Sequence, residues 1–190
     1  NLTVGPKIGG NYAEAVVGHP LYVNPLFATI NEVDSDLVAL VYAGLFAHRS
    51  GATVPYLAES YTISPDGKTY DIVLKANLRW SDGEPVTARD VVFTIELIQN
   101  PEVGSPLSPA FQGVKASAVD NTHVRLTLPR PFAFFVSALT VGILPEHLWG
   151  DLPAANLRLA KLNLQPIGAG PWAVQKFTKD EAGVIQSYTL

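Results

Sequence analysis

Residues 57–93 read LAESYTISPDGKTYDIVLKANLRWSDGEPVTARDVVF, and this stretch contains a hairpin, a turn and the beginning of a helix. Its first half predicts two strands, 59–63 and 69–75. Between them, Ser64-Pro65-Asp66-Gly67 has the residue types of a β-turn, with Pro fixing φ and Gly free to take a positive φ. Alternate residues of the second strand form one apolar face: Tyr70, Ile72 and Leu74.

The second half of the stretch predicts a turn at Ser81–Pro85 and then a helix. Thr87 is followed three residues later by Asp90, which is the spacing of a capping box with Asp in the acidic position. Apolar residues then recur at helical spacing as far as Asn100-Pro101, namely Val91, Val92, Ile95 and Ile98.

The remaining segments predict many short elements joined by Pro and Gly turns. An apolar strand is expected at Tyr12–Val17, and an ordered loop at 18–33. A helix is expected from Asp34-Ser35-Asp36 to about Phe46, with these residues capping its beginning. Further along we expect a mostly irregular 101–113, a hairpin of 113–119 with 123–128, short helices within 131–139 and 146–149, surface helix or loop at 151–165, and strands at 172–177 and 184–190. Strands and helices do not alternate regularly, so the pattern predicts a mixed α+β fold with largely antiparallel sheets and peripheral helices.

Composition narrows the class of protein. The 190 residues carry a net charge of −4, and the 13 Lys and Arg residues form no cluster, which argues against nucleic acid as a partner. The absence of Cys excludes disulfides and Cys-ligated metal within the chain. No apolar run reaches the length of a membrane helix, so we expect no direct membrane insertion. The chain begins at Asn1 without Met, which suggests a removed leader or a cut sequence.

Several motifs, in order, resemble the extracytoplasmic solute-binding proteins of family 5, the peptide- and nickel-binding components of ABC importers. The 57–93 stretch carries the Trp-x-Asp-Gly turn and the Thr-Ala-x-Asp-Val helix start of that family. The flanking matches are Asn24-Pro25-Leu26, Tyr42-Ala43-Gly44-Leu45, Val119–Val124 and Pro166-Ile167-Gly168-Ala169-Gly170-Pro171-Trp172. Ala169 and Trp172 replace the family's usual Thr and Tyr.

This resemblance implies the amino-terminal lobe of a periplasmic-binding-protein type II-like fold. Residues 1–45 and 167–190 would belong to the core subdomain of the first lobe, and 46–166 to the extra subdomain of the peptide-binding branch, with the second lobe absent. Such receptors close two lobes on a small solute, here expected to be a peptide, and deliver it to a membrane ABC permease. The implied location is periplasmic or at the cell surface. The implied ligand contacts are Ala28, Thr29, Ile30, Asn31 and Leu107.

Other chemistries fit the sequence less well. We expect Trp80 to be a packed aromatic residue rather than a ligand contact. We expect Gly168-Ala169-Gly170 to form a tight turn rather than a phosphate-binding loop. We interpret Asp34 and Asp36 as helix-capping residues rather than metal ligands. The four His residues are widely separated in the sequence, so we expect them at the surface. We expect the cluster of Phe132, Phe134 and Phe135 to belong to the core. We therefore expect no catalytic residue, no cofactor and no metal. The alternatives are a hydrolase or other enzyme on an α+β fold, and a protein-interaction module.

Overall fold

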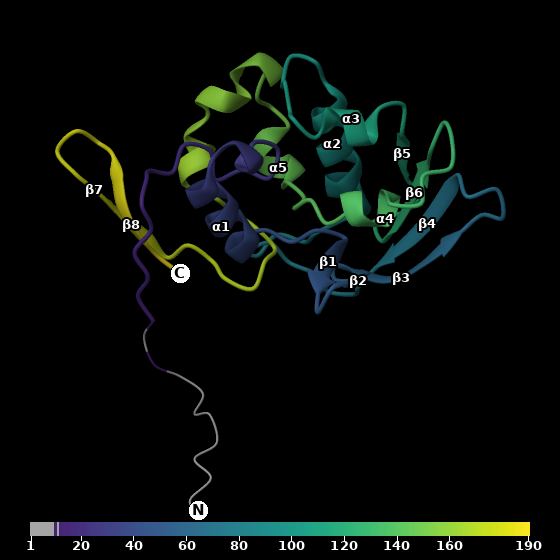
Figure 1. The fold of residues 1–190 in the computed structure, drawn as a ribbon, viewed down its shortest axis with the longest axis horizontal. Helices are drawn as coiled ribbons and strands as arrows, with labels where there is room; N and C mark the ends of the chain where they lie inside the picture. Colours follow the sequence, from purple (N-terminus) through teal and green to yellow (C-terminus); the bar gives the residue numbers. More distant parts are fainter. Residues whose placement is uncertain (1–9, 11) are drawn as a thin grey trace, which may run out of the picture.

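The computed structural model describes residue 10 and residues 12–190. Short helices and antiparallel strands make up the chain, with a four-stranded sheet at one end and a two-stranded ribbon at the other (Figure 1). The helices are η1 (Ala28–Ile30), α1 (Glu32–Val41), α2 (Ala88–Gln99), α3 (Ser108–Phe111), α4 (Phe135–Ala138), α5 (Glu146–Trp149), η2 (Ala154–Leu159) and η3 (Lys161–Leu164). The strands are β1 (Phe46–Arg49), β2 (Ala52–Pro55), β3 (Ala58–Ile63), β4 (Thr69–Leu74), β5 (Lys115–Ala118), β6 (His123–Thr127), β7 (Lys176–Lys179) and β8 (Ile185–Thr189).

The four-stranded sheet has the order β3-β4-β6-β5, and every neighbouring pair is antiparallel. The predicted hairpin of β3 and β4 is confirmed, with Gly67 at φ 69° in its turn. The alternate residues Tyr70, Ile72 and Leu74 are buried as expected. Because all strand pairs in the described residues are antiparallel and helices surround them, the predicted α+β class with largely antiparallel sheets is confirmed.

Helix α2 covers the β5 and β6 part of this sheet, and its first turn is fixed by Asp90. Oδ2 of Asp90 accepts hydrogen bonds from the backbone N–H of Thr87 at 2.8 Å and from the Thr87 hydroxyl at 3.1 Å. Oδ1 accepts the N–H of Glu146 at 2.9 Å, so the same carboxylate also holds the beginning of α5. The predicted capping residues are therefore confirmed, together with a longer-range role that the local spacing did not predict.

Helix α1 differs from its prediction at both ends. It begins at Glu32, and its cap is Asn31, whose side chain accepts the N–H of Val33. The prediction that Asp34 caps the helix was wrong, because its carboxylate is fully buried and accepts the N–H groups of Leu21 and Tyr22. The helix also ends at Val41 rather than near Phe46, since Phe46 begins β1.

The Gly168-Ala169-Gly170 turn ends α1. Gly170 donates its N–H to the carbonyl oxygen of Val41 at 2.8 Å, and Trp172 donates to the carbonyl of Leu40 at 3.1 Å. A Cβ at Gly168 would lie 2.0 Å from the Val41 oxygen. These contacts satisfy carbonyl groups that the last turn of a helix leaves free, so the tight-turn reading of this motif is confirmed.

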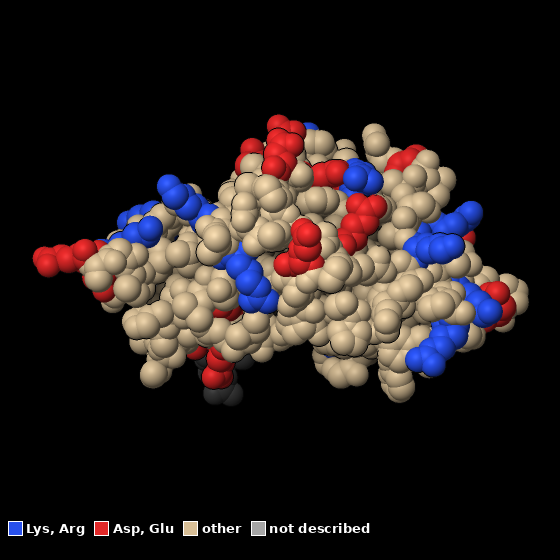
Figure 2. All heavy atoms as spheres, turned by 90° about the horizontal axis from the view of Figure 1, so that it is seen from above, with Lys and Arg blue, Asp and Glu red and all other residues tan. Residues whose placement is uncertain are grey.

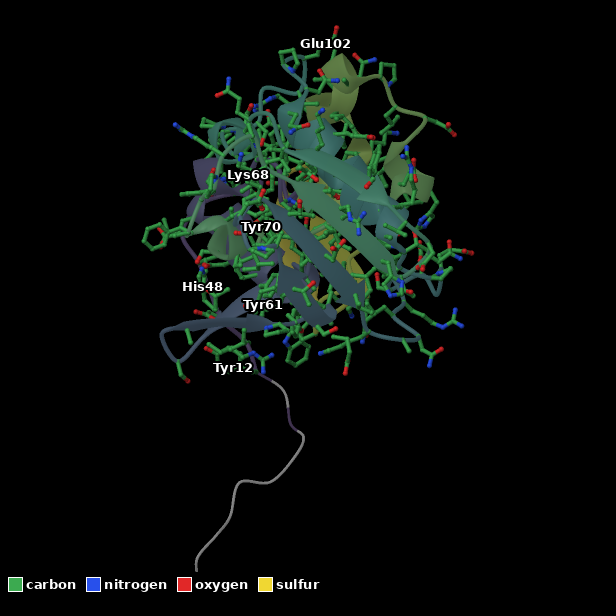
Figure 3. The ribbon with its side chains drawn as sticks, turned by 90° about the vertical axis from the view of Figure 1, so that its right-hand side faces the viewer. Tyr12, His48, Tyr61, Lys68, Tyr70 and Glu102 are labelled. Carbon is green, nitrogen blue, oxygen red and sulfur yellow. The ribbon has the colours of Figure 1, made fainter. Side chains whose placement is uncertain are left out.

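Three other expectations need correction. Residues 12–17 form no strand, because no described segment pairs with them, and Tyr12 is 86% exposed below the body of the molecule (Figure 3). The strand expected at 172–177 begins only at Lys176, since Trp172 is used at the end of α1. Phe135 is buried, but Phe132 and Phe134 are exposed, because they lie in a loop outside α4. By contrast, Trp80 is buried as expected.

Within the described residues, no helix is both long and apolar enough to span a bilayer. On the face shown in Figure 2, Lys and Arg side chains form small separate groups, and Asp and Glu side chains are interspersed among them. A continuous basic surface of the kind that binds nucleic acid is not seen on that face.

Candidate functional site

The segment 28–31 lies between a tightly bonded loop and the beginning of α1. Asn24 organises the loop: its Oδ1 accepts the N–H of Leu26, and its carbonyl accepts the N–H groups of Phe27 and Ala28. Its Nδ2 donates to Oδ1 of Asn163 at 3.1 Å, which ties the loop to η3. Because Asn24 and Asn163 are both buried and bonded, they fix the position at which η1 leaves the core.

The four predicted residues of this segment are not equally available. Ala28 is buried and its carbonyl accepts the Ser35 hydroxyl at 2.8 Å. Asn31 caps α1 and donates from Nδ2 to the carbonyl of His19 at 2.8 Å, so its polar atoms already serve the fold. Thr29 and Ile30 are exposed, Ile30 at 55%. Direct contact with another molecule is therefore open chiefly to Thr29 and Ile30.

Leu107 is fastened to the same loop through Ser105. The Ser105 hydroxyl donates to the carbonyl of Leu26 at 2.8 Å and accepts the N–H of Leu107 at 3.3 Å. Leu107 is half-buried and packs against the core. The structure thus joins two segments that are far apart in sequence. We call Thr29, Ile30 and Leu107 the candidate surface.

Arg158 is a neighbour of this surface that sequence reasoning missed. Its guanidinium lies 4.3 Å from the ring centre of Phe27 and 5.6 Å from that of Tyr22, and it donates to the carbonyl of Gly104 at 3.0 Å. It therefore holds the loop before η1 beside the loop before Leu107. No motif marks Arg158, because its role depends on two segments that only the fold brings together.

Helix α1 carries a buried ionisable group, Asp34. Burial raises the pKa of the Asp34 carboxyl above its ordinary value, although its hydrogen bonds from Tyr22 and Leu21 oppose this shift. Burial also raises the pKa of Tyr188 to about 12, with Asp34 adding to the effect, and raises that of Tyr42. The Tyr188 hydroxyl donates to the carbonyl of Leu164 at 2.9 Å. Asp34 anchors the 21–22 segment and Tyr188 anchors β8, so the raised pKa values of these two groups reflect structural burial.

The remaining ionisable candidates form surface pairs. His147 lies 2.9 Å from Asp82, and His123 lies 2.7 Å from Asp120. The first pair joins α5 to the turn before α2, and the second lies within the β5–β6 hairpin; all four residues are exposed. The described residues contain no group of three His, Asp or Glu side chains placed to hold a metal ion. The arrangement at the candidate surface offers an apolar contact, a hydroxyl and ordered backbone, which suits recognition of a ligand by shape and hydrogen bonding.

Comparison with known proteins gives a consistent result. Residues 52–187 match the profile of the bacterial extracellular solute-binding proteins, family 5. The chain is 32% identical over 187 residues to the dipeptide-binding protein of Escherichia coli, covering 86% of this chain and 35% of the relative.

Two solved structures share its fold. The oligopeptide-binding protein AppA from Bacillus subtilis, in complex with a nonapeptide, matches 90% of this chain and 35% of its own length, with 27% identity and a TM-score of 0.79. NikZ from Campylobacter jejuni, in complex with Ni(L-His), matches 87% of this chain and 32% of its own length, with 33% identity and a TM-score of 0.75. The chain spans about a quarter to a third of the length of the curated relatives that it matches.

Proposed function

This chain belongs to the bacterial extracellular solute-binding proteins of family 5, and from that membership we propose that it forms part of a receptor that captures a solute for an ABC importer. The predicted family and its type II-like fold are confirmed by the profile and structural matches. The family and the relatives reported above are binding proteins. The receptor would act outside the cytoplasm, catalyse no reaction, and pass its ligand to a membrane permease.

A peptide is the ligand that we propose. The observation that carries this proposal is the joining of the loop before η1 to the 105–107 loop by the Ser105 hydroxyl. This bond links the segment that carries the exposed Thr29 and Ile30 to the segment that carries the half-buried, apolar Leu107. A peptide presents backbone hydrogen-bonding groups and side chains in alternation, so a surface of this mixed character can receive both.

The lobe arrangement also remains a proposal. Residues 1–45 and 167–190 would form the core subdomain of one lobe and 46–166 the extra subdomain, although residues 1–9 and 11 lie outside the described part of the first segment. A second lobe would be supplied by sequence beyond these 190 residues and would close over the candidate surface. The chain alone should then bind peptides weakly, and micromolar or tighter binding of a peptide pool in calorimetry would contradict this two-lobe reading.

A chimera tests the receptor function directly. This chain would replace the matching segment of the E. coli dipeptide-binding protein, and dipeptide binding would be measured by calorimetry. We expect the folded chimera to bind a dipeptide, and the pair of changes Thr29→Arg and Leu107→Arg to weaken binding at least about tenfold by steric and charge conflict. Leu159→Arg, at an 82% exposed position elsewhere, is the control.

The outcomes separate two failures. A folded chimera that binds no dipeptide would contradict the receptor function. A chimera that binds normally with both arginines present would retain the function and reject Thr29 and Leu107 as its contacts.

A further inference from the structure

A hollow of about 310 Å³ opens at the carboxyl end of α1, between this helix, the β1–β2 hairpin and residues 140–142. The candidate surface begins at the other end of α1, and a ten-residue helix is about 15 Å long. The hollow is therefore separate from the surface that we assign to the transported solute. We call it the α1 hollow.

The walls of the α1 hollow are held by backbone hydrogen bonds. Phe46 donates its N–H to the carbonyl of Leu139 at 3.2 Å, and Ile143 donates to the carbonyl of Ala43 at 3.0 Å. A Cβ at Gly44 would lie 2.5 Å from the carbonyl oxygen of Thr140. Because these two segments approach so closely, the hollow exists without any rearrangement of the chain, as ligand pockets usually do.

Small apolar side chains leave the space open. Val38 and Ala39 of α1 line it from one side, and Ala43 and Ala47 line it from the connection into β1. The volume corresponds to about ten water molecules at roughly 30 Å³ each. A molecule the size of a single aromatic ring with a short polar group fits this space.

Polar side chains that can donate hydrogen bonds also line the hollow. His48, Tyr56 and Thr140 line it, and no Asp or Glu is among the described residues that do so. Nδ1 of His48 bonds the Thr53 hydroxyl at 3.1 Å, so its Nε2 has no protein partner in the described structure. His48 lies at the surface on the side of the molecule where the β1–β2 hairpin projects (Figure 3).

Two cations lie against the ring of Tyr56, one of these wall residues. The guanidinium carbon of Arg49 lies 5.2 Å from the ring centre of Tyr56, and Nζ of Lys75 lies 6.0 Å from it. The hollow thus has a free imidazole nitrogen on one residue of its wall and two cations against the ring of another, Tyr56. This combination favours an anionic group, and a carboxylate accepts hydrogen bonds from such donors most strongly. We propose that the α1 hollow is a second binding site, for a small monocarboxylate with an apolar body.

Phenylacetate and its uncharged analogue phenylacetamide test this proposal on the full chain. Both would be titrated while backbone and alanine methyl signals are followed by NMR. We expect phenylacetate to give saturable shifts at Ala39, Ala43 and Ala47, and phenylacetamide to bind about tenfold more weakly, since it lacks the charge.

Two exposed substitutions locate the site. Ala39→Leu fills the hollow from the helix and should abolish the shifts, while His48→Ala should remove most of the preference for the charged probe. His123→Ala, on the β5–β6 hairpin, is the matched control and should change neither.

The proposal is overturned if phenylacetate shows no saturable shift up to its solubility limit, if both probes bind equally, or if Ala39→Leu leaves binding intact. None of these outcomes bears on the dipeptide chimera, so failure here and failure of the receptor function are distinguishable.

Discussion

The β3-β4-β6-β5 sheet packs against α2 and the rest of the core through an apolar face, and each of its turns carries its own signal in the sequence. The region of α1, the 18–31 loop and β7–β8 is built differently. Its contacts are buried polar groups, such as Asp34 and Asn24, and close backbone approaches at Gly168 and Gly170. The first region shows how local pattern specifies structure. The second shows a fold that depends on single residues meeting distant partners.

The substitution with the largest expected effect on stability lies in the region of α1, the 18–31 loop and β7–β8. Gly168→Ala would place a Cβ 2.0 Å from the Val41 oxygen, and because backbone must move, we expect it to lower the free energy of unfolding by about 4 kcal/mol. Urea denaturation measures the change. Hydrogen exchange at Gly170 and Trp172 should accelerate, while β4 and β6 amides change little. Gly183→Ala, in a turn with open space but a φ of +83°, is the control and should cost only about 1 kcal/mol.

A loss of protection that spread equally through β4 and β6 would break the comparison. The sheet would then depend on the α1 region for its stability, and the two regions would unfold as one unit.

The next effect tests the sheet itself. Leu126 is fully buried on β6 and belongs to the main core cluster. Leu126→Ala should therefore cost about 3 kcal/mol through lost burial and the cavity that remains. Chemical denaturation gives the value. Arg125→Ala, at the adjacent position on the opposite face, removes only an exposed pair with Asp71 and should change stability little. A similar cost for both variants would contradict the predicted alternation.

The same contrast explains what could be predicted from sequence. The β3–β4 hairpin and the beginning of α2 were predictable because turn residues, alternation and the Thr87–Asp90 spacing all lie within a few residues of each other. The cap of α1 was not, because Asn31 and Asp34 compete locally and the choice is made by Leu21 and Tyr22. An apolar run at 12–17 likewise indicates a strand only if a partner strand is present.

The candidate surface was only partly predictable. The resemblance pointed to Ala28–Asn31 and Leu107, and the structure leaves Thr29 and Ile30 exposed while Ala28 and Asn31 serve the fold. Ser105 and Arg158, which bring the loops together, carry no local signal. His48 and Tyr56 could not be identified as candidate binding residues from sequence, because only the fold places them at the hollow between α1 and the β1–β2 hairpin.

A smaller, pH-dependent effect on stability tests the role of the buried Asp34 carboxyl. Asp34→Asn keeps one acceptor oxygen for two N–H donors, so it should cost about 2 kcal/mol at low pH. Burial raises the pKa of Asp34 in the folded state above the ordinary value of 3.8. Its stabilising contribution is therefore complete below that value and is lost as the pH rises through the raised pKa.

The advantage of the wild type over Asp34→Asn should accordingly shrink as the pH increases from about 4. Denaturation curves at several pH values measure this difference. Asp36→Asn, at an exposed position on the same helix, should show no such trend. An advantage that grew with pH would mean that the two backbone hydrogen bonds outweigh desolvation, and the assigned direction would be wrong.

The smallest expected effect on stability is at Thr87, whose capping role was predicted from the local sequence alone. The Thr87 hydroxyl donates to Asp90 at 3.1 Å, but the backbone N–H of Thr87 also reaches this carboxylate at 2.8 Å and remains after Thr87→Ala. The loss should therefore be about 1 kcal/mol, as for other capping residues, and Thr87→Ser should restore it. Thermal and urea unfolding of the three proteins give the comparison. If Thr87→Ala cost as much as Gly168→Ala, the start of α2 would depend on long-range contacts too. The Glu146 N–H bond to Asp90 and the Ala88 N–H bond to the carbonyl of Asn121 would then be the places to look, because both link this cap to distant segments.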